Sequence, residues 1–168
     1  MNSSKKNVRL AVFIAFAMVL SIVEWIIPLN FVMPGLKLGL ANIIIIVAIF
    51  HFSLKDVLII VIIRAVLTAI ISANLVMLLF SLAGGIFSTF IMYALLRWFG
   101  RFFSIIGASI SGAFFHNMGQ MLVAIFFIGD SSVLLLLPII GFASIISGTI
   151  VGIISCKFYE NISQAHLN

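Results

Sequence analysis

The sequence contains very few charged residues. Only 8% of its 168 residues are Asp, Glu, Lys or Arg, whereas 64% are hydrophobic. An ordinary soluble domain carries about 25% charged residues, so this chain has too few of them to cover a water-facing surface. We infer that its solvent is the lipid bilayer and that residues 1–168 form one integral membrane domain.

Signatures of catalysis and of metal binding are also missing. The single cysteine, Cys156, excludes an internal disulfide. No glycine-rich phosphate loop is present, and the only aspartates, Asp56 and Asp130, are too isolated to hold Mg²⁺ on a diphosphate. The other two histidines lie far along the chain from His116, without a thiol or carboxylate at ligand spacing. We therefore expect no enzyme, no metal and no cofactor.

Long apolar runs make up most of the chain. A helix needs about 20 apolar residues to cross a bilayer. We predict an all-α bundle of six transmembrane helices at residues 8–27, 38–52, 56–72, 74–99, 102–128 and 132–158. The second run is short, which suggests a tilted or partly re-entrant segment. The connection that starts at Pro28 contains two prolines and two glycines, and either a lid or a turn packed on the bundle fits this composition.

The basic residues predict the orientation of the bundle. Six crossings place both termini on one side, and Lys and Arg favour the cytoplasmic side. With the termini inside, Lys37 is the one basic residue in an outer loop, and Arg64 lies within a span. The other seven basic residues are cytoplasmic: Lys5, Lys6, Arg9, Lys55, Arg97, Arg101 and Lys157. We therefore predict cytoplasmic termini, and we interpret the net charge of +5 as topology rather than nucleic-acid binding.

Small residues recur at a spacing of four in several runs. In lipid, such repeats allow helix backbones to approach closely. In the last three runs, where they include Gly148-x-x-x-Gly152, we interpret them as packing inside the bundle. In the first run, Ala11 and Ala15 fit either internal packing or a contact with a partner helix.

Polar residues within the apolar runs gather at the centre and in the outer half of the expected bundle. They are Glu24, Asn42, Arg64, His116, Asn117 and Gln120. An ionisable group at membrane depth is costly unless it faces protein or water, so it marks a candidate functional site. His116 and Gln120 share one helix face. Their common depth predicts a pocket that opens outward.

Structural roles for the same residues stay open. Arg64 and Glu24 fit an ion pair that holds two helices together, and His116, Asn117 and Gln120 fit hydrogen bonds between helices. If Arg64 and Lys37 instead face a ligand, they favour an anionic group such as a carboxylate or phosphate.

The polar residues and their neighbours resemble the Gx transporter family, also named heptaprenyl diphosphate synthase component I. That family is similar to the substrate-binding S components of energy-coupling factor (ECF) transporters. The resemblance covers about residues 8–157 and rests on these motifs: Glu24-x-x-x-Pro28, Pro34-Gly-x-Lys37-Leu-Gly-Leu-Ala-Asn42, Arg64, Ser81-Leu-Ala-Gly-Gly85 with Ser88, and His116-Asn-x-Gly-Gln120.

The resemblance implies a six-helix fold with cytoplasmic termini and a substrate pocket toward the outer face. It also implies partners, namely a transmembrane coupling protein and two cytoplasmic ATPases, with Ala11 and Ala15 matching the helix-one contact of S components. The expected substrate-binding residues are Glu24, Trp25, Lys37, Asn42, Arg64, His116, Asn117 and Gln120, with Trp25 as an apolar or stacking wall.

The hypothesis from the sequence is thus a multi-pass protein of the bacterial cytoplasmic membrane that captures a small molecule for an ATP-driven importer. The expected substrate is anionic and either vitamin-like or related to isoprenoids or quinones. Two alternatives stay open. One is a non-catalytic membrane subunit of heptaprenyl diphosphate or menaquinone synthesis, and the other is a solitary proton-coupled carrier that uses Glu24 and His116.

Overall fold

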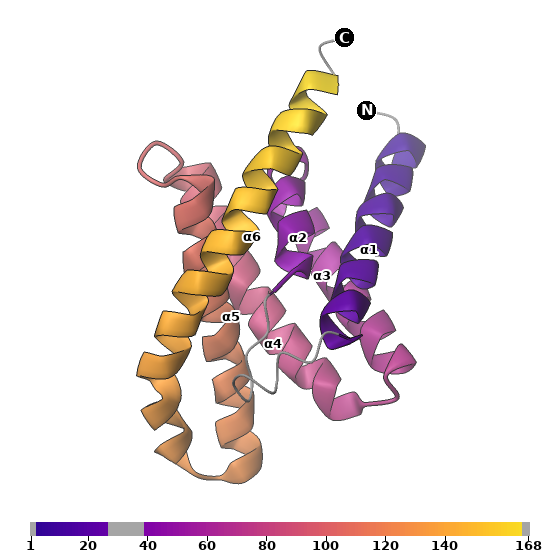
Figure 1. Ribbon diagram of the computed structural model, residues 1–168. Helices are drawn as coiled ribbons and strands as arrows, with labels where there is room; N and C mark the ends of the chain where they lie inside the picture. Colours follow the sequence, from indigo (N-terminus) through magenta and orange to yellow (C-terminus); the bar gives the residue numbers. More distant parts are fainter. Residues whose placement is uncertain (1–2, 27–38, 166–168) are drawn as a thin grey trace.

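The computed structural model describes residues 3–26 and 39–165, and every regular element within them is helical (Figure 1). The α-helices are α1 (Ser3–Ile26), α2 (Ala41–His51), α3 (Leu54–Ile71), α4 (Leu75–Tyr93), α5 (Ile105–Ile128) and α6 (Leu137–Ala165). A π-helical segment, η2 (Ala94–Trp98), continues α4, and a 3-10 segment, η3 (Ser131–Leu136), leads into α6. The all-helical class predicted from the sequence is confirmed.

The helices form one bundle in which the start of α1 and the end of α6 lie at the same end (Figure 1). The α3–α4 and α5–α6 connections lie at the opposite end, which we call the loop end. Four helical segments are long and apolar enough to cross a membrane: Ser4–Glu24, Leu75–Trp98, Ile105–Ile128 and Ser131–Asn161. These segments support a membrane protein with transmembrane helices. Six crossings and cytoplasmic termini stay predictions.

The second helix is the element that departs most from a membrane crossing. α2 has 11 residues and is therefore about 16 Å long, roughly half of the hydrocarbon core. Residues 41–49 are all buried, although a helix that is apolar on every side is suited to lipid as well as to a protein core. α2 lies in the half of the bundle that contains the start of α1 and the end of α6 (Figure 1). It is therefore a core helix and not a lipid-facing one.

Polar side chains at the helix ends explain where several helices begin and end. The Asn74 side chain accepts a hydrogen bond from the Met77 amide at 3.0 Å, which starts α4. Ser104 accepts one from the Gly107 amide at 3.1 Å, which starts α5. Both are N-caps. α5 ends at Ile128 and is followed by Gly129, whose φ of 72° is the left-handed conformation that glycine adopts easily.

Glycines bring the backbones of α4, α5 and α6 into close contact. A methyl carbon at Gly119 would lie 2.7 Å from the carbonyl oxygen of Ala83, and one at Gly148 would lie 2.5 Å from the Cα of Ile110. A methyl at Gly152 would lie 2.8 Å from the Cα of Ile106. Since only hydrogen fits at these positions, the predicted internal packing of these three helices is confirmed.

The first helix packs against the bundle along one edge. Leu10 and Ala17 are buried there, and Lys6 Nζ lies 2.7 Å from Asp56 Oδ1 at the start of α3. The other side of α1 is exposed and includes Ala11 and Ala15, together with Val12, Phe16 and Val19. The small-residue stripe of α1 is therefore directed away from the bundle.

Candidate functional site

Arg64 is buried in the third helix near the middle of the bundle, with 5% of its surface exposed. One guanidinium nitrogen, Nη1, donates a hydrogen bond of 3.1 Å to the hydroxyl of Ser21 on α1. The other two, Nε and Nη2, have no hydrogen-bond partner among the residues that the structure describes. A buried guanidinium has five N–H donors to satisfy, so this arrangement leaves capacity for an acceptor such as an anionic group.

Glu24 and Asn42 meet at the start of α2. The Glu24 carboxylate accepts a hydrogen bond from the Gly39 amide. Its negative charge also attracts the positive charge of Arg64. Asn42 is buried, and its side-chain nitrogen would lie 3.2 Å from a methyl carbon added at Gly39. The structure therefore brings Glu24, Asn42 and Arg64 to one region between α1, α2 and α3.

His116 in α5 and Arg64 in α3 each lie against one of two consecutive glycines in α4. A methyl carbon at Gly84 would lie 2.8 Å from the His116 carbonyl oxygen and 3.0 Å from ring atoms Cε1 and Nε2. A methyl at Gly85 would lie 3.3 Å from Arg64 Nη2. Successive helical residues point about 100° apart, so His116 and Arg64 contact two adjacent faces of α4 at the same level.

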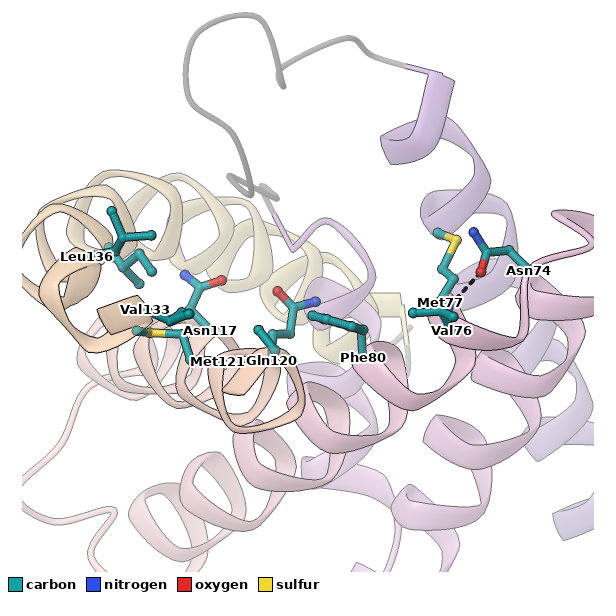
Figure 2. A pocket seen from close by; sticks show the side chains of 11 residues that line it. Asn74, Val76, Met77, Phe80, Asn117, Gln120, Met121, Val133 and Leu136 are labelled. Carbon is teal, nitrogen blue, oxygen red and sulfur yellow. Dashed lines mark hydrogen bonds between the residues drawn. The ribbon is translucent and has the colours of Figure 1, made fainter. Parts of the chain in front are cut away.

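A cavity of ≈ 420 Å³ opens at the loop end of α4, α5, η3 and α6 (Figure 2). Its polar lining comes from Asn74, Asn117 and Gln120, and no charged residue lines it within the described part of the chain. The apolar lining residues are Val76, Met77, Phe80, Met121, Ala124, Val133, Leu136 and Ile140. A concave, mostly apolar site with a few polar groups is typical of small-molecule binding.

The carboxamides of Asn117 and Gln120 have different hydrogen-bonding states. Asn117 Nδ2 donates to the hydroxyl of Ser144 at 3.0 Å, and that hydroxyl donates to the Ile140 carbonyl at 2.7 Å. Gln120 is only 8% exposed, yet its side chain forms no hydrogen bond with the described part of the chain. Figure 2 shows both carboxamides on the face of α5 that borders the cavity.

The predicted site residues thus fall into two groups, with His116 between them. Asn117 and Gln120 line the cavity, whereas Glu24, Asn42 and Arg64 lie on the α1–α2–α3 side. Lys37 and the side chain of Trp25 lie outside the described residues, as does the expected lid or turn up to residue 38.

Sequence reasoning missed three polar residues of the site. Asn74 lines the cavity, Ser21 binds Arg64, and Ser144 orients Asn117. Asn74 directly precedes an apolar run, which is the position of a helix N-cap, and this signal was available in the sequence. Among residues 3–26 and 39–165, no three His, Cys, Asp or Glu side chains are grouped so that they could hold a metal ion.

The fold and the cavity define a helical membrane protein with a small-molecule cavity at one end of its bundle. The chain belongs to the family described as heptaprenyl diphosphate synthase component I, whose family model matches residues 13–158. The resemblance inferred from the motifs is therefore confirmed. No curated protein and no solved structure matches the chain. The prediction that the chain is not an enzyme agrees with this assignment, because the description names one component of a synthase.

Proposed function

We propose that the protein is the membrane-embedded substrate-binding subunit of an ATP-driven importer of the ECF type. The observation that carries the proposal is the cavity at the loop end, which contains Asn117 and Gln120. The basic residues favour cytoplasmic termini, and the cavity lies at the opposite end of the bundle. In a bacterial cytoplasmic membrane, this orientation would let a small molecule enter from outside.

An anionic group on the substrate would account for the spare donors of Arg64. A charge buried near the bilayer centre is expensive unless it is paired, and two guanidinium nitrogens lack partners among the described residues. A carboxylate or phosphate would accept hydrogen bonds from both. Glu24, Asn42 and His116 lie close to this region and, with Trp25 and Lys37, stay proposed binding residues.

The exposed side of α1 would contact the transmembrane coupling protein. Ala11 and Ala15 lie on this side, and small residues at this spacing let a second helix approach closely in lipid. In this arrangement, the substrate would sit at the loop end while the ATPases act on the opposite, cytoplasmic side.

The family description favours a second candidate function. It names a component of heptaprenyl diphosphate synthase, so the chain would instead be a membrane subunit that assembles with a soluble prenyl synthase. In this case the cavity would hold the apolar part of an isoprenoid and no ATPase would be a partner.

Co-purification from native membranes distinguishes the two functions. The importer subunit is expected to bring down a transmembrane coupling protein with ATPases, and mass spectrometry of the gently purified chain should detect a retained small molecule. Recovery of a prenyl synthase without ATPases would overturn the importer proposal and support the second candidate.

A further inference from the structure

The polar groups in the cavity at the loop end indicate which chemistry its occupant has. This inference deepens the proposed function and rests on it, because it concerns the molecule that the cavity receives. Among the described residues that line the cavity, none is charged. The part of the substrate that contacts these residues should therefore be uncharged, since an ion would lose its hydration there without gaining a charged partner from them.

The orientation of Asn117 leaves a hydrogen-bond acceptor at the cavity wall. Its Nδ2 is used by Ser144, whose own hydroxyl hydrogen is used by the Ile140 carbonyl. These hydrogen bonds hold the amide nitrogen of Asn117 toward α6 and leave its side-chain oxygen for another donor. Figure 2 shows the oxygen ends of the Asn117 and Gln120 carboxamides turned toward each other.

In this orientation of the Gln120 amide, two acceptors face each other, and a donor placed between them would bind to both. Asn117 and Gln120 are 9% and 8% exposed, and a buried carboxamide without partners costs free energy. The Asn117 oxygen has no donor among the residues that the structure describes, and Gln120 has no partner among them. An N–H or O–H group of the occupant would satisfy both oxygens.

We infer that the substrate inserts an uncharged, largely apolar group bearing an N–H or O–H donor, and that this donor is bound between Asn117 and Gln120. The remaining contacts of the group are apolar and come from Met77, Phe80 and Met121. The cavity volume of ≈ 420 Å³ is large enough for a fused two-ring system, so an aromatic alcohol or an N–H heterocycle fits this description.

Matched probes test the inference with the full chain in lipid nanodiscs at neutral pH. 2-Naphthol is compared with 2-methoxynaphthalene, and indole with 1-methylindole, since each pair differs by the presence of the donor. Saturable binding above that of protein-free nanodiscs is measured by equilibrium dialysis. The donor-bearing member of each pair is expected to bind about five- to tenfold more tightly.

Variants assign this preference to the two amides. Gln120→Met and Asn117→Leu should each reduce the preference to about twofold or less, with thermal unfolding used to show that both fold. Ser155→Ala is the matched control, because it removes another buried hydroxyl of α6 that is hydrogen-bonded at 2.7 Å within the helix. It should keep the wild-type preference.

Two results would overturn the inference. Equal binding of both members of a pair, unchanged by the amide variants, would mean that the cavity accepts any apolar molecule, such as a lipid chain. Binding of neither member would exclude this substrate class. Neither result bears on the coupling protein and ATPases, whose recovery tests the proposed function separately.

Discussion

Arg64 and His116 contact adjacent faces of α4 through two consecutive glycines. Gly85 leaves room for Nη2 of Arg64, and Gly84 leaves room for the carbonyl oxygen and ring of His116. Any larger residue at either position would separate α4 from its neighbours. The two ionisable side chains at the centre of the bundle are thus positioned by the absence of side chains on the helix between them.

The two glycines should differ in their tolerance of alanine. At Gly84 the nearest atom to an added methyl is backbone, the His116 oxygen at 2.8 Å. At Gly85 it is a side-chain atom, Cγ1 of the buried Val61, at 2.7 Å, and a side-chain atom can shift by a few tenths of an ångström more easily than backbone. We expect Gly84→Ala to destabilise the protein by about 1–3 kcal/mol and Gly85→Ala by less, measured as thermal unfolding in nanodiscs.

Gly141→Ala serves as the control for this comparison. The nearest atom to its added methyl is a Phe114 ring carbon at 3.8 Å, so the change should be neutral or slightly stabilising through helix propensity. If Gly84→Ala is as stable as Gly141→Ala, the close approach of α4 and α5 is wrong.

The role of Arg64 is testable by a double-mutant cycle with Glu24. Arg64→Met should lower substrate affinity while the substrate-free protein stays folded, and Glu24→Gln added to it should not rescue binding. If the two charges form a structural pair, each single change should instead cost about 3–5 kcal/mol, and the double variant should recover stability. Both thermal stability and affinity for the retained molecule are measured.

Ser21→Ala provides the matched control for the cycle. It removes the one hydrogen bond that Arg64 Nη1 donates to Ser21 and leaves the spare nitrogens in place, so affinity should fall only slightly. Strong coupling in stability with unchanged affinity would refute the ligand role of Arg64.

The exposed stripe of α1 should be needed for partner binding alone. Replacing both Ala11 and Ala15 by Leu should abolish association with the coupling protein in pull-down experiments but leave substrate binding intact, because the stripe faces away from the bundle. Ala17→Leu is the opposite control. Ala17 is 0% exposed, so the larger side chain should destabilise the fold. Loss of folding in the Ala11 and Ala15 variant would show that the stripe packs internally.

Cysteine labelling tests the orientation of the bundle. In a Cys156→Ser background, a cysteine at position 2 or 168 should react with a membrane-impermeant maleimide only after the cells are opened. A cysteine at Asp130, which is exposed between α5 and η3, should react in intact cells. External labelling of either terminus would contradict the six-crossing topology.

The sequence by itself determined that the protein is a helical membrane protein and to which family it belongs. These properties follow from local features, because the scarcity of charge and the length of the apolar runs need no knowledge of neighbours. The spacing of small residues also sufficed to predict that the last three helices pack closely, since glycine at such positions has one main use in lipid.

The tertiary structure alone decided which polar residues lie together. Distance along a helix gives the depth of Arg64 and of Gln120, but not the neighbours on each side, which depend on how the helices rotate and approach each other. Contacts at Gly84, Gly85 and Gly119 set that arrangement and bring Arg64 and His116 onto adjacent faces of α4. In the same way, α2 has an apolar sequence suited to lipid. It is nevertheless buried, because the other five α-helices pack around it.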